Sequence, residues 1–294
     1  MFRRFLLGAV LMMTCLGAVA QDESQLSIPQ YMKMVRAGAQ LPPPPPAEGA
    51  LEPLLTYTAD TLPEVRRTAY YFIGESARAG KGDAFVVALL NGMNDEDPGV
   101  RASVMAYLER IGPAAYNEKA ENLLTNNLQK WASAYPEMAM IGAGVLGQKA
   151  RPALLPLVSR TENLDHRWIL YLALSRAGDD NATRKVVNAI GRQQVSDDWV
   201  YDLAPDLVYT RQKAAFDLLV KELNSQQKLC SPAAADLSGN IVCGYRILEM
   251  VAPHIQDFPI KTDVTGDLDT DDYPKALETA RQWFSVNPDY VILQ

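Results

Sequence analysis

Hydrophobic residues in the part of the chain that follows residue 48 recur with the spacing of an α-helix. Between positions 63 and 79 the apolar residues fall at i, i+4, i+7, i+8 and i+12, namely Val65, Ala69, Phe72, Ile73 and Ala77. That spacing places them on one stripe of a helix. The pattern therefore predicts a helix over 63–79 that buries one face and exposes the other.

The same pattern returns 35 residues later. The segment DTLPEVRR at 60–67 corresponds to DEDPGVRA at 95–102. Self-similarity with this period is typical of a solenoid, in which stacked helix pairs share one continuous core. In each copy a proline, Pro63 or Pro98, lies in the first turn of a helix, where its missing N–H costs nothing. The copies predict helix pairs at 48–58 with 63–79 and at 83–93 with 98–111.

Later copies are less regular but keep the apolar stripes. They predict helix pairs at 118–134 with 136–148, at 151–160 with 165–177, within 180–209 and within 211–253, and a last helix at 273–285. Terminal repeats of a solenoid differ from the others because one of their faces meets water. We therefore expect an all-α domain over 48–294, an α-solenoid of about six helix pairs with a C-terminal capping helix.

The motif Asp-x-x-x-Pro-x-Val-Arg, followed by an Ala/Leu stripe and a Gly, resembles the HEAT repeat, in particular the short HEAT-like units of phycobilin lyases. The two clear copies span 60–74 and 95–112, and the second has Glu109 where Gly74 would align. The resemblance implies a structural ladder in which the repeat arginines pair with aspartates of neighbouring repeats. The ladder residues would be Asp60, Arg66, Asp95 and Arg101. In particular, we expect Arg101 to reach the Asp60 region.

The first 20 residues have the pattern of a signal peptide. Arg3 and Arg4 precede an apolar stretch over 5–16, and small residues at 18–20 form a cleavage site after Ala20. The apolar stretch is too short for a stable membrane helix, although an uncleaved anchor and lipidation at Cys15 are alternatives. We expect an exported protein, periplasmic or secreted.

Residues 21–47 predict an N-terminal arm. Ser27 can cap a short helix that ends at Gly38, and five prolines at 42–46 follow. A proline run of this kind adopts polyproline II and serves as a stiff spacer, although it can also be a ligand for aromatic grooves.

Charge limits the classes of partner. The formal net charge is −7, and removal of Arg3 and Arg4 with the signal peptide makes it −9. An acidic chain has no electrostatic reason to bind nucleic acid or an anionic membrane. No later segment is apolar over the length needed to span a bilayer. We expect no nucleic-acid partner and no stable membrane span.

Two cysteines remain after the first 20 residues, Cys230 and Cys243. Disulfides persist in the compartments that exported proteins reach. The simplest interpretation is one bridge that closes a short loop, with two free thiols or a metal pair as the alternatives.

An acidic segment near the C-terminus partly fits a calcium-binding loop. Asp267, Asp269 and Asp271 have the spacing of EF-hand ligands, and Glu278 stands at the twelfth place. The sixth place needs a glycine for its sharp turn and holds Asp272 instead. We favour a solvated acidic loop whose Asp271 or Asp272 caps the last helix, and we expect no metal site.

Other patterns predict structure rather than catalysis. The two histidines, His166 and His254, fall in different repeats, with no nucleophile in a recognisable setting beside either. The glycines of the segment GAGVLG at 142–147 lie in a helix-forming stretch, where they favour close helix packing over a nucleotide loop. Three tryptophans could form a sugar-binding strip, but at helical spacing we expect core residues at Trp131, Trp168 and Trp199.

These observations favour a non-enzymatic scaffold that holds a protein partner in the cell envelope, with no catalytic residues and no cofactor. The exposed positions beside the buried stripe of the second helices are the expected contacts, namely Arg67, Tyr71, Ser103 and Arg110. A carbohydrate- or calcium-dependent envelope binder is the alternative. A chromophore lyase, as among HEAT-like relatives, is a further one.

Overall fold

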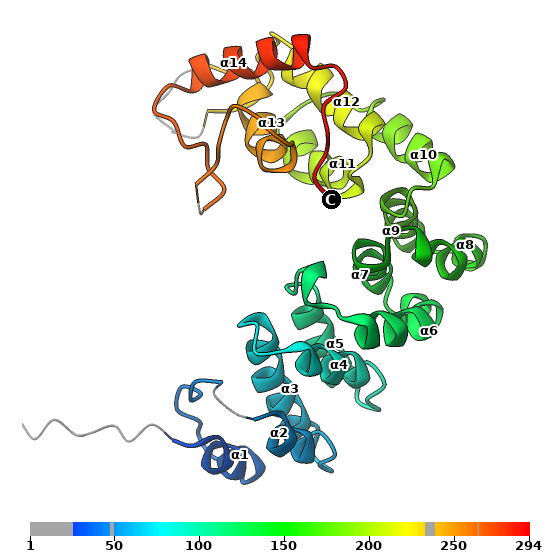
Figure 1. Ribbon diagram of the computed structural model, residues 1–294, viewed down its shortest axis with the longest axis vertical. Helices are drawn as coiled ribbons and strands as arrows, with labels where there is room; N and C mark the ends of the chain where they lie inside the picture. Colours follow the sequence, from blue (N-terminus) through cyan, green and yellow to red (C-terminus); the bar gives the residue numbers. More distant parts are fainter. Residues whose placement is uncertain (1–25, 48–49, 233–238, 264) are drawn as a thin grey trace, which may run out of the picture. The chain divides into compact units, whose positions relative to one another are not determined.

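The computed structural model describes residues 26–47, 50–232, 239–263 and 265–294, and the regular secondary structure of these residues is helical (Figure 1). In these ranges strand-like pairing is limited to isolated bridges, such as Cys230 with Ile241 and Ile255 with Ile292. The prediction of an all-α protein is confirmed. The predicted signal peptide and Cys15 lie outside the described residues.

The chain divides into two compact units, 1–46 and 47–294. In the first unit, helix α1 spans Ile28–Arg36. The side chain of Gln30 reaches back to the helix start, where its Oε1 accepts hydrogen bonds from the backbone N–H of Ser27 at 2.9 Å and from its hydroxyl at 2.8 Å. These bonds fix where α1 begins. The chain leaves the helix at Gly38, which has a φ of +62°.

In the second unit the helices fall where the apolar pattern predicts them. They are α2 (Leu51–Tyr57), α3 (Pro63–Arg78), α4 (Asp83–Gly92), α5 (Pro98–Leu108), α6 (Glu118–Ala134), α7 (Glu137–Leu146), α8 (Arg151–Arg160), α9 (Leu164–Arg176), α10 (Asp180–Ile190), α11 (Ala204–Thr210), α12 (Lys213–Leu223), α13 (Gly244–Val251) and α14 (Tyr273–Val286). Short helical turns add Pro113–Ala115, Gly147–Ala150, Trp199–Leu203 and Ala252–His254.

Contacts between alternate helices join α2, α4, α6 and α8 in turn, and α10 with α12; they also join α3 with α5, and α7, α9, α11 and α13 in turn (Figure 1). We group the helices accordingly. The first-helix row comprises α2, α4, α6, α8, α10 and α12. The second-helix row comprises α3, α5, α7, α9, α11 and α13. The most extensive contacts join helices that are close in sequence, such as α3 with α5 and α7 with α9 within the second-helix row, and α6 with α7 between the rows. Helix α14 packs against α13.

The core lies between the rows and is built from the predicted stripes. Val65, Ala69, Phe72 and Ile73 of α3 are completely buried. Packing is tight enough that Gly142 of α7 faces Leu128 of α6, and a Cβ at position 142 would lie 2.5 Å from Cδ1 of that leucine. The predicted role in close helix packing is confirmed for Gly142. It is wrong for Gly144 and Gly147, where an added Cβ would meet no atom within 4 Å.

Aspartates begin several helices. The side chain of Asp97 accepts a hydrogen bond from the N–H of Val100 and so caps α5, with Pro98 in the first turn. Asp179 caps α10 in the same way, and Asp272 caps α14 through the N–H of Lys275. Such caps satisfy N–H groups that have no partner within the helix. The predicted capping role of the C-terminal acidic segment is confirmed for Asp272.

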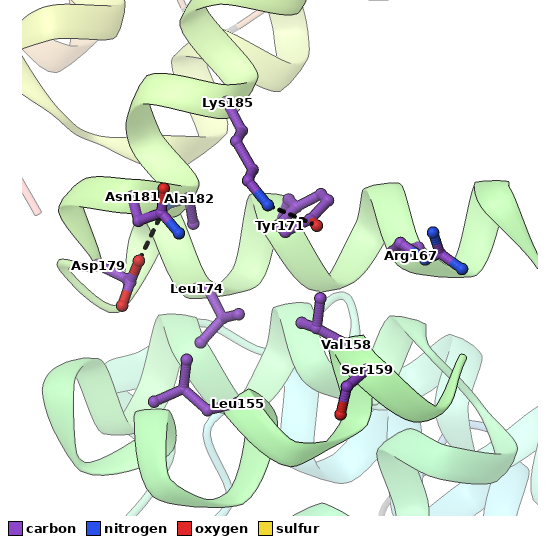
Figure 2. A pocket seen from close by; sticks show the side chains of 10 residues that line it. All are labelled: Leu155, Val158, Ser159, Arg167, Tyr171, Leu174, Asp179, Asn181, Ala182 and Lys185. Atoms are coloured by element: carbon purple, nitrogen blue, oxygen red, sulfur yellow. Dashed lines mark hydrogen bonds between the residues drawn. The ribbon is translucent and has the colours of Figure 1, made fainter. Parts of the chain in front are cut away.

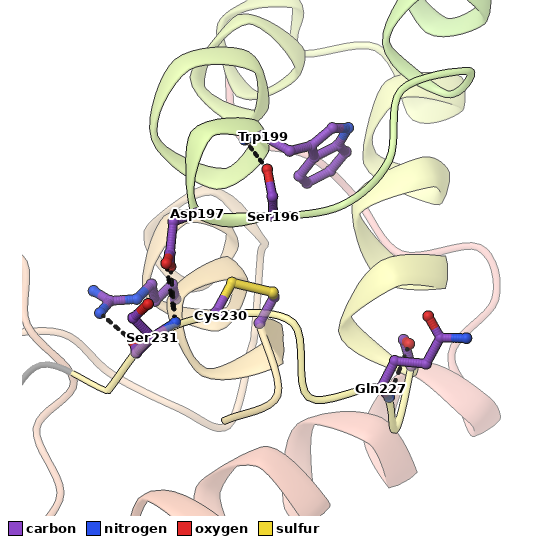
Figure 3. Close-up of a disulfide and its surroundings, with 9 residues drawn as sticks. Ser196, Asp197, Trp199, Gln227, Cys230 and Ser231 are labelled. Carbon is purple, nitrogen blue, oxygen red and sulfur yellow. Dashed lines mark hydrogen bonds between the residues drawn. A yellow bond between two sulfur atoms is a disulfide. The ribbon is translucent and has the colours of Figure 1, made fainter. Parts of the chain in front are cut away.

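The predicted disulfide is confirmed (Figure 3). Cys230 and Cys243 are joined between α12 and α13, with an S–S distance of 2.07 Å. The bridged segment is tied to the chain before α11, because the N–H of Ser231 donates to both carboxylate oxygens of Asp197, at 3.0 and 3.1 Å. Within the described ranges, every helix is too short or too polar to cross a membrane.

Candidate functional site

A buried ion pair joins the two clear repeats. The guanidinium of Arg66 on α3 donates two hydrogen bonds, each 2.8 Å long, to the carboxylate of Asp95, which precedes α5. Both side chains are almost completely buried. Burial has the largest single effect on the pKa of Asp95 and raises it. The hydrogen bonds from Arg66 and from the N–H of Asp97, together with the charges of Arg66 and Arg101, outweigh burial and hold that pKa below its usual value. The pair stays ionised, and its role is structural.

The second repeat arginine makes the same backbone contacts but has a different partner. Arg66 donates to the carbonyls of Asp60 and Thr61, and Arg101 donates to those of Asp95 and Glu96. The Nε of Arg101 then reaches the hydroxyl of Tyr135, at 2.6 Å.

The expectation that Arg101 reaches back to the Asp60 region is therefore wrong. Each arginine points forward, toward the following repeat, and the third copy offers Tyr135 where the second offers Asp95. Sequence spacing fixes the period of such a ladder but not its direction.

The four predicted contact residues lie on α3, on α5 and directly after α5. Arg67 is half-exposed, 3.8 Å from Glu64, and the ring of Tyr71 packs edge-on against that of Tyr107. The hydroxyl of Ser103 donates to the carbonyl of Gly99 in its own helix, and Arg110 is exposed. The structure brings Tyr71 and α5 together, but none of the four lines either groove described below.

A groove of about 520 Å³ opens on the second-helix row, between the end of α5, α7, and the C-terminal ends of α9 and α11. We call it the second-helix groove. Apolar side chains of α7 line it, namely Met140, Ile141 and Val145. Charged residues from four separate segments complete it, namely Glu109, Glu137, Arg176 and Arg211.

Two arginines and a histidine cluster at this groove. Arg176 donates to the carbonyl of Tyr209 at 3.3 Å, and Arg211 donates to that of Val208 at 2.6 Å. The Nη2 of Arg211 also lies 3.1 Å from Nε2 of His254. The buried Nε of Arg211 has no hydrogen-bond partner among the described residues.

Burial and mutual repulsion disfavour charge in this cluster. Burial, with a further contribution from Arg176, lowers the pKa of Arg211 to about 10. Burial and the two arginines lower the pKa of His254 to about 4. At neutral pH the imidazole is therefore uncharged, and its Nε2 can accept the hydrogen bond from Arg211.

The carboxylates of the groove repel each other in turn. Burial raises the pKa of Glu109, and the charge of Glu137 raises it further. Tyr209 also lines this groove, and its hydroxyl donates to the carbonyl of Met140 at 2.8 Å. That bond ties α11 to α7 across 69 residues of sequence. The groove thus combines an apolar lining with two pairs of like charges.

A second groove, of about 420 Å³, lies on the first-helix row between α8, α9 and α10 (Figure 2). Most of its polar side chains already have hydrogen-bond partners, and Ser159 and Arg167 donate to backbone carbonyls. Lys185 donates to the hydroxyl of Tyr171 at 2.9 Å and lies over its ring, and Asp179 caps α10 while pairing with Arg151. We call it the first-helix groove; the contacts of Lys185 and Asp179 hold α8, α9 and α10 together.

Other candidate groups have structural surroundings. Trp131 and Trp199 are core residues with 2% exposure each, and the indole of Trp168 donates to Asp206. Among the described residues no three His, Cys, Asp or Glu side chains converge as metal ligands would. Asp263 instead accepts hydrogen bonds from Thr265 and from the N–H of Asp267.

No protein-family model, curated protein or solved structure matches this chain. The groups that line the two grooves are therefore the basis for assigning a function.

Proposed function

We propose that residues 47–294 form an α-solenoid of about six HEAT-like helix pairs, capped by α14, and that this solenoid is a non-enzymatic scaffold of the cell envelope. It binds a protein partner along the second-helix row. Two observations support the solenoid. The extensive helix contacts join near neighbours in sequence, and Arg66 and Arg101 make the same backbone contacts in successive repeats.

The second-helix groove is the observation that carries the proposed partner site. It is lined by helices from four successive pairs, each packed on the next, so its shape is fixed by the scaffold. An apolar centre with charges around it is the composition of a protein-binding surface. The first-helix groove is the weaker candidate because its lysine and aspartate are already paired.

The envelope location rests on separate observations. The Cys230–Cys243 disulfide is compatible with an oxidising compartment. The sequence of the first 20 residues has the features of a signal peptide.

Site-specific photo-cross-linking in intact cells tests the partner site. A photo-reactive residue replaces Ile141 in the second-helix groove, and a matched one replaces Leu155, an exposed residue of the first-helix groove. We expect Ile141 to give a protein adduct and Leu155 to give little. An adduct at Leu155 alone moves the site to the other row, and the absence of adducts at both positions contradicts the scaffold proposal.

A combined substitution tests the contact residues proposed on α3 and α5. Alanine at all four positions should reduce capture of the cross-linked partner if the partner extends along the row from the groove. The residues are Arg67, Tyr71, Ser103 and Arg110. If the fourfold variant captures as much partner as the unmodified protein does, the partner contacts only the groove and not these four residues.

A further inference from the structure

The arginine cluster of the second-helix groove lacks an acidic counterpart. Buried Arg66 and partly buried Arg151 each pair with an aspartate. In the part of the chain that the structure describes, no carboxylate lies within ion-pair distance of Arg176 or Arg211. Two partly buried guanidiniums side by side repel each other, and they are stabilised when an anion joins them.

The hydrogen-bonding capacity of the cluster is also incompletely used. A guanidinium carries five N–H donors, and Arg176 directs one of its nitrogens at the carbonyl of Tyr209. The buried Nε of Arg211 has no partner among the described residues. A buried donor left without an acceptor is costly. Because this Nε is closed off from solvent, a small shift of the guanidinium is needed to bring it to an incoming acceptor, and the bond then formed removes that cost.

The backbone at Arg211 supports a binding role. Its φ is +54°, in the left-handed region that glycine adopts without cost. An arginine held there by the surrounding structure is a type of strain that clusters at binding sites. Arg211 follows the last residue of α11 and lines the same groove as Arg176.

We propose that Arg176 and Arg211 form a carboxylate-binding subsite, and that its occupant is an acidic side chain or the C-terminal carboxylate of an extended segment of the protein partner. The inference rests on the proposed function and specifies the chemistry of that site. A planar carboxylate matches the two-donor edge of a guanidinium, with which it forms short, strong hydrogen bonds.

The rest of the groove favours a peptide over a phosphate group. Glu109 and Glu137 line the same groove and repel a multiply charged anion. Their carboxylates can accept hydrogen bonds from peptide N–H groups or pair with a basic side chain of the occupant. The apolar surface of Met140, Ile141 and Val145 can bury an apolar residue of the same segment.

Selection from a random peptide library, displayed with free C-termini and with internal positions varied, tests the subsite. We expect the full-length protein to enrich peptides with Asp, Glu or a terminal carboxylate next to an apolar residue. The best peptide, labelled with a fluorophore, should bind Arg176→Gln and Arg211→Gln at least about tenfold more weakly, the effect of one lost charge-assisted hydrogen bond.

Three controls sharpen this measurement. Arg160→Gln removes an equal charge from an exposed position at the end of α8, outside the groove, and should leave affinity unchanged. Arg211→Lys keeps the charge but loses the two-donor edge, so its affinity should be intermediate. Melting temperatures and circular dichroism in the helical region identify any variant that fails to fold. If a glutamine variant does not fold, the affinity of Arg176→Lys is measured instead, and it should be lower than that of the unmodified protein.

The inference is overturned if no acidic peptide is enriched, or if the groove variants bind it as well as the unmodified protein does. Equal competition by inorganic phosphate and by acetate shows an unspecific anion site, which also overturns it. If cross-linking at Ile141 still captures a partner in these cases, the scaffold proposal stands and only the carboxylate subsite fails.

Discussion

Arg66 and Asp95, 29 residues apart in the sequence, meet in a buried, two-bond ion pair that joins α3 to the segment before α5. The guanidinium also donates to the carbonyl of Asp60 at 2.8 Å, so one side chain holds the chain before α3 and the start of the next repeat. Removal of either partner leaves the other charge buried and uncompensated.

Arg66→Ala should therefore lower the free energy of unfolding by about 3–5 kcal/mol. Denaturant unfolding followed by circular dichroism measures the change. Arg67→Ala, at the neighbouring exposed position, is the matched control and should change it by less than about 0.5 kcal/mol. Equal losses in the two variants would show that the Arg66–Asp95 pair does not stabilise the repeat boundary.

Arg101 should contribute less than Arg66, because its partner Tyr135 is neutral. Arg101→Ala should lower the free energy of unfolding by about 1–3 kcal/mol, and Tyr135→Phe by about 1 kcal/mol. Identical thermal stability of Arg101→Ala and the unmodified protein would contradict this assignment.

The two glycines of α7 offer a matched pair. A Cβ at Gly142 would lie 2.5 Å from Leu128, which is completely buried, whereas a Cβ at Gly144 meets no atom within 4 Å. Gly142→Ala should cost about 1–3 kcal/mol through overpacking, and Gly144→Ala should be neutral or stabilise by up to about 1 kcal/mol. Thermal melts of both variants measure the difference, and the opposite order would exclude close α6–α7 packing.

His254 should make stability depend on pH. Its pKa falls from 6.5 in the unfolded chain to about 4 in the folded protein, because of burial and the charges of Arg211 and Arg176. Between these values the unfolded chain binds the proton and the folded protein does not, so stability is complete above pH 6.5 and falls as the pH approaches 4. The loss should be roughly 1–2 kcal/mol, less than the full shift implies because the ring is partly exposed.

The measurement compares unfolding free energies of the unmodified protein and His254→Gln from pH 7 to pH 4. Glutamine can still accept the hydrogen bond from Arg211 but does not titrate, so the variant should lose less stability on acidification. His166→Gln, at an exposed position, is the control and should follow the unmodified protein. Parallel curves for all three proteins would exclude His254 as the source.

The disulfide predicts the thiol content of the protein. In the native, oxidised protein, Cys230 and Cys243 should show no reactive thiol, because they are bonded to each other. Reduction should lower the free energy of unfolding by about 3 kcal/mol, the value for a loop of this size in the chain-entropy model. Mass spectrometry after alkylation without reductant checks the pairing, and two labelled cysteines would contradict it.

The helices were predictable because their signals are local. Stripes such as Val65, Ala69 and Phe72 report helical periodicity within a few turns, and Pro63 and Pro98 mark where helices begin. The direction of the arginine ladder was not predictable, because a 35-residue period is the same whether Arg101 points backward or forward.

The second-helix groove was missed because its charged residues come from separate parts of the chain. One signal was available: Arg176 and Arg211 stand 35 residues apart, the spacing of the clear repeats. Both end second-row helices, and the periodic pattern could have placed them on neighbouring repeats. The third member, His254, follows α13 and belongs to no repeated motif, so only the fold brings it to Arg211.

The preference of the helices for contacts with near neighbours in sequence has a consequence for biosynthesis. A nascent chain can bury the stripe of α3 as soon as α4 and α5 have left the ribosome or a translocation channel, long before α14 is made. The Arg66–Asp95 pair would close at that early stage, and each later helix would find a finished surface to pack on. The C-terminal segment with Cys230 and Cys243 would be the last to settle, so its oxidation should follow the assembly of the rest of the chain.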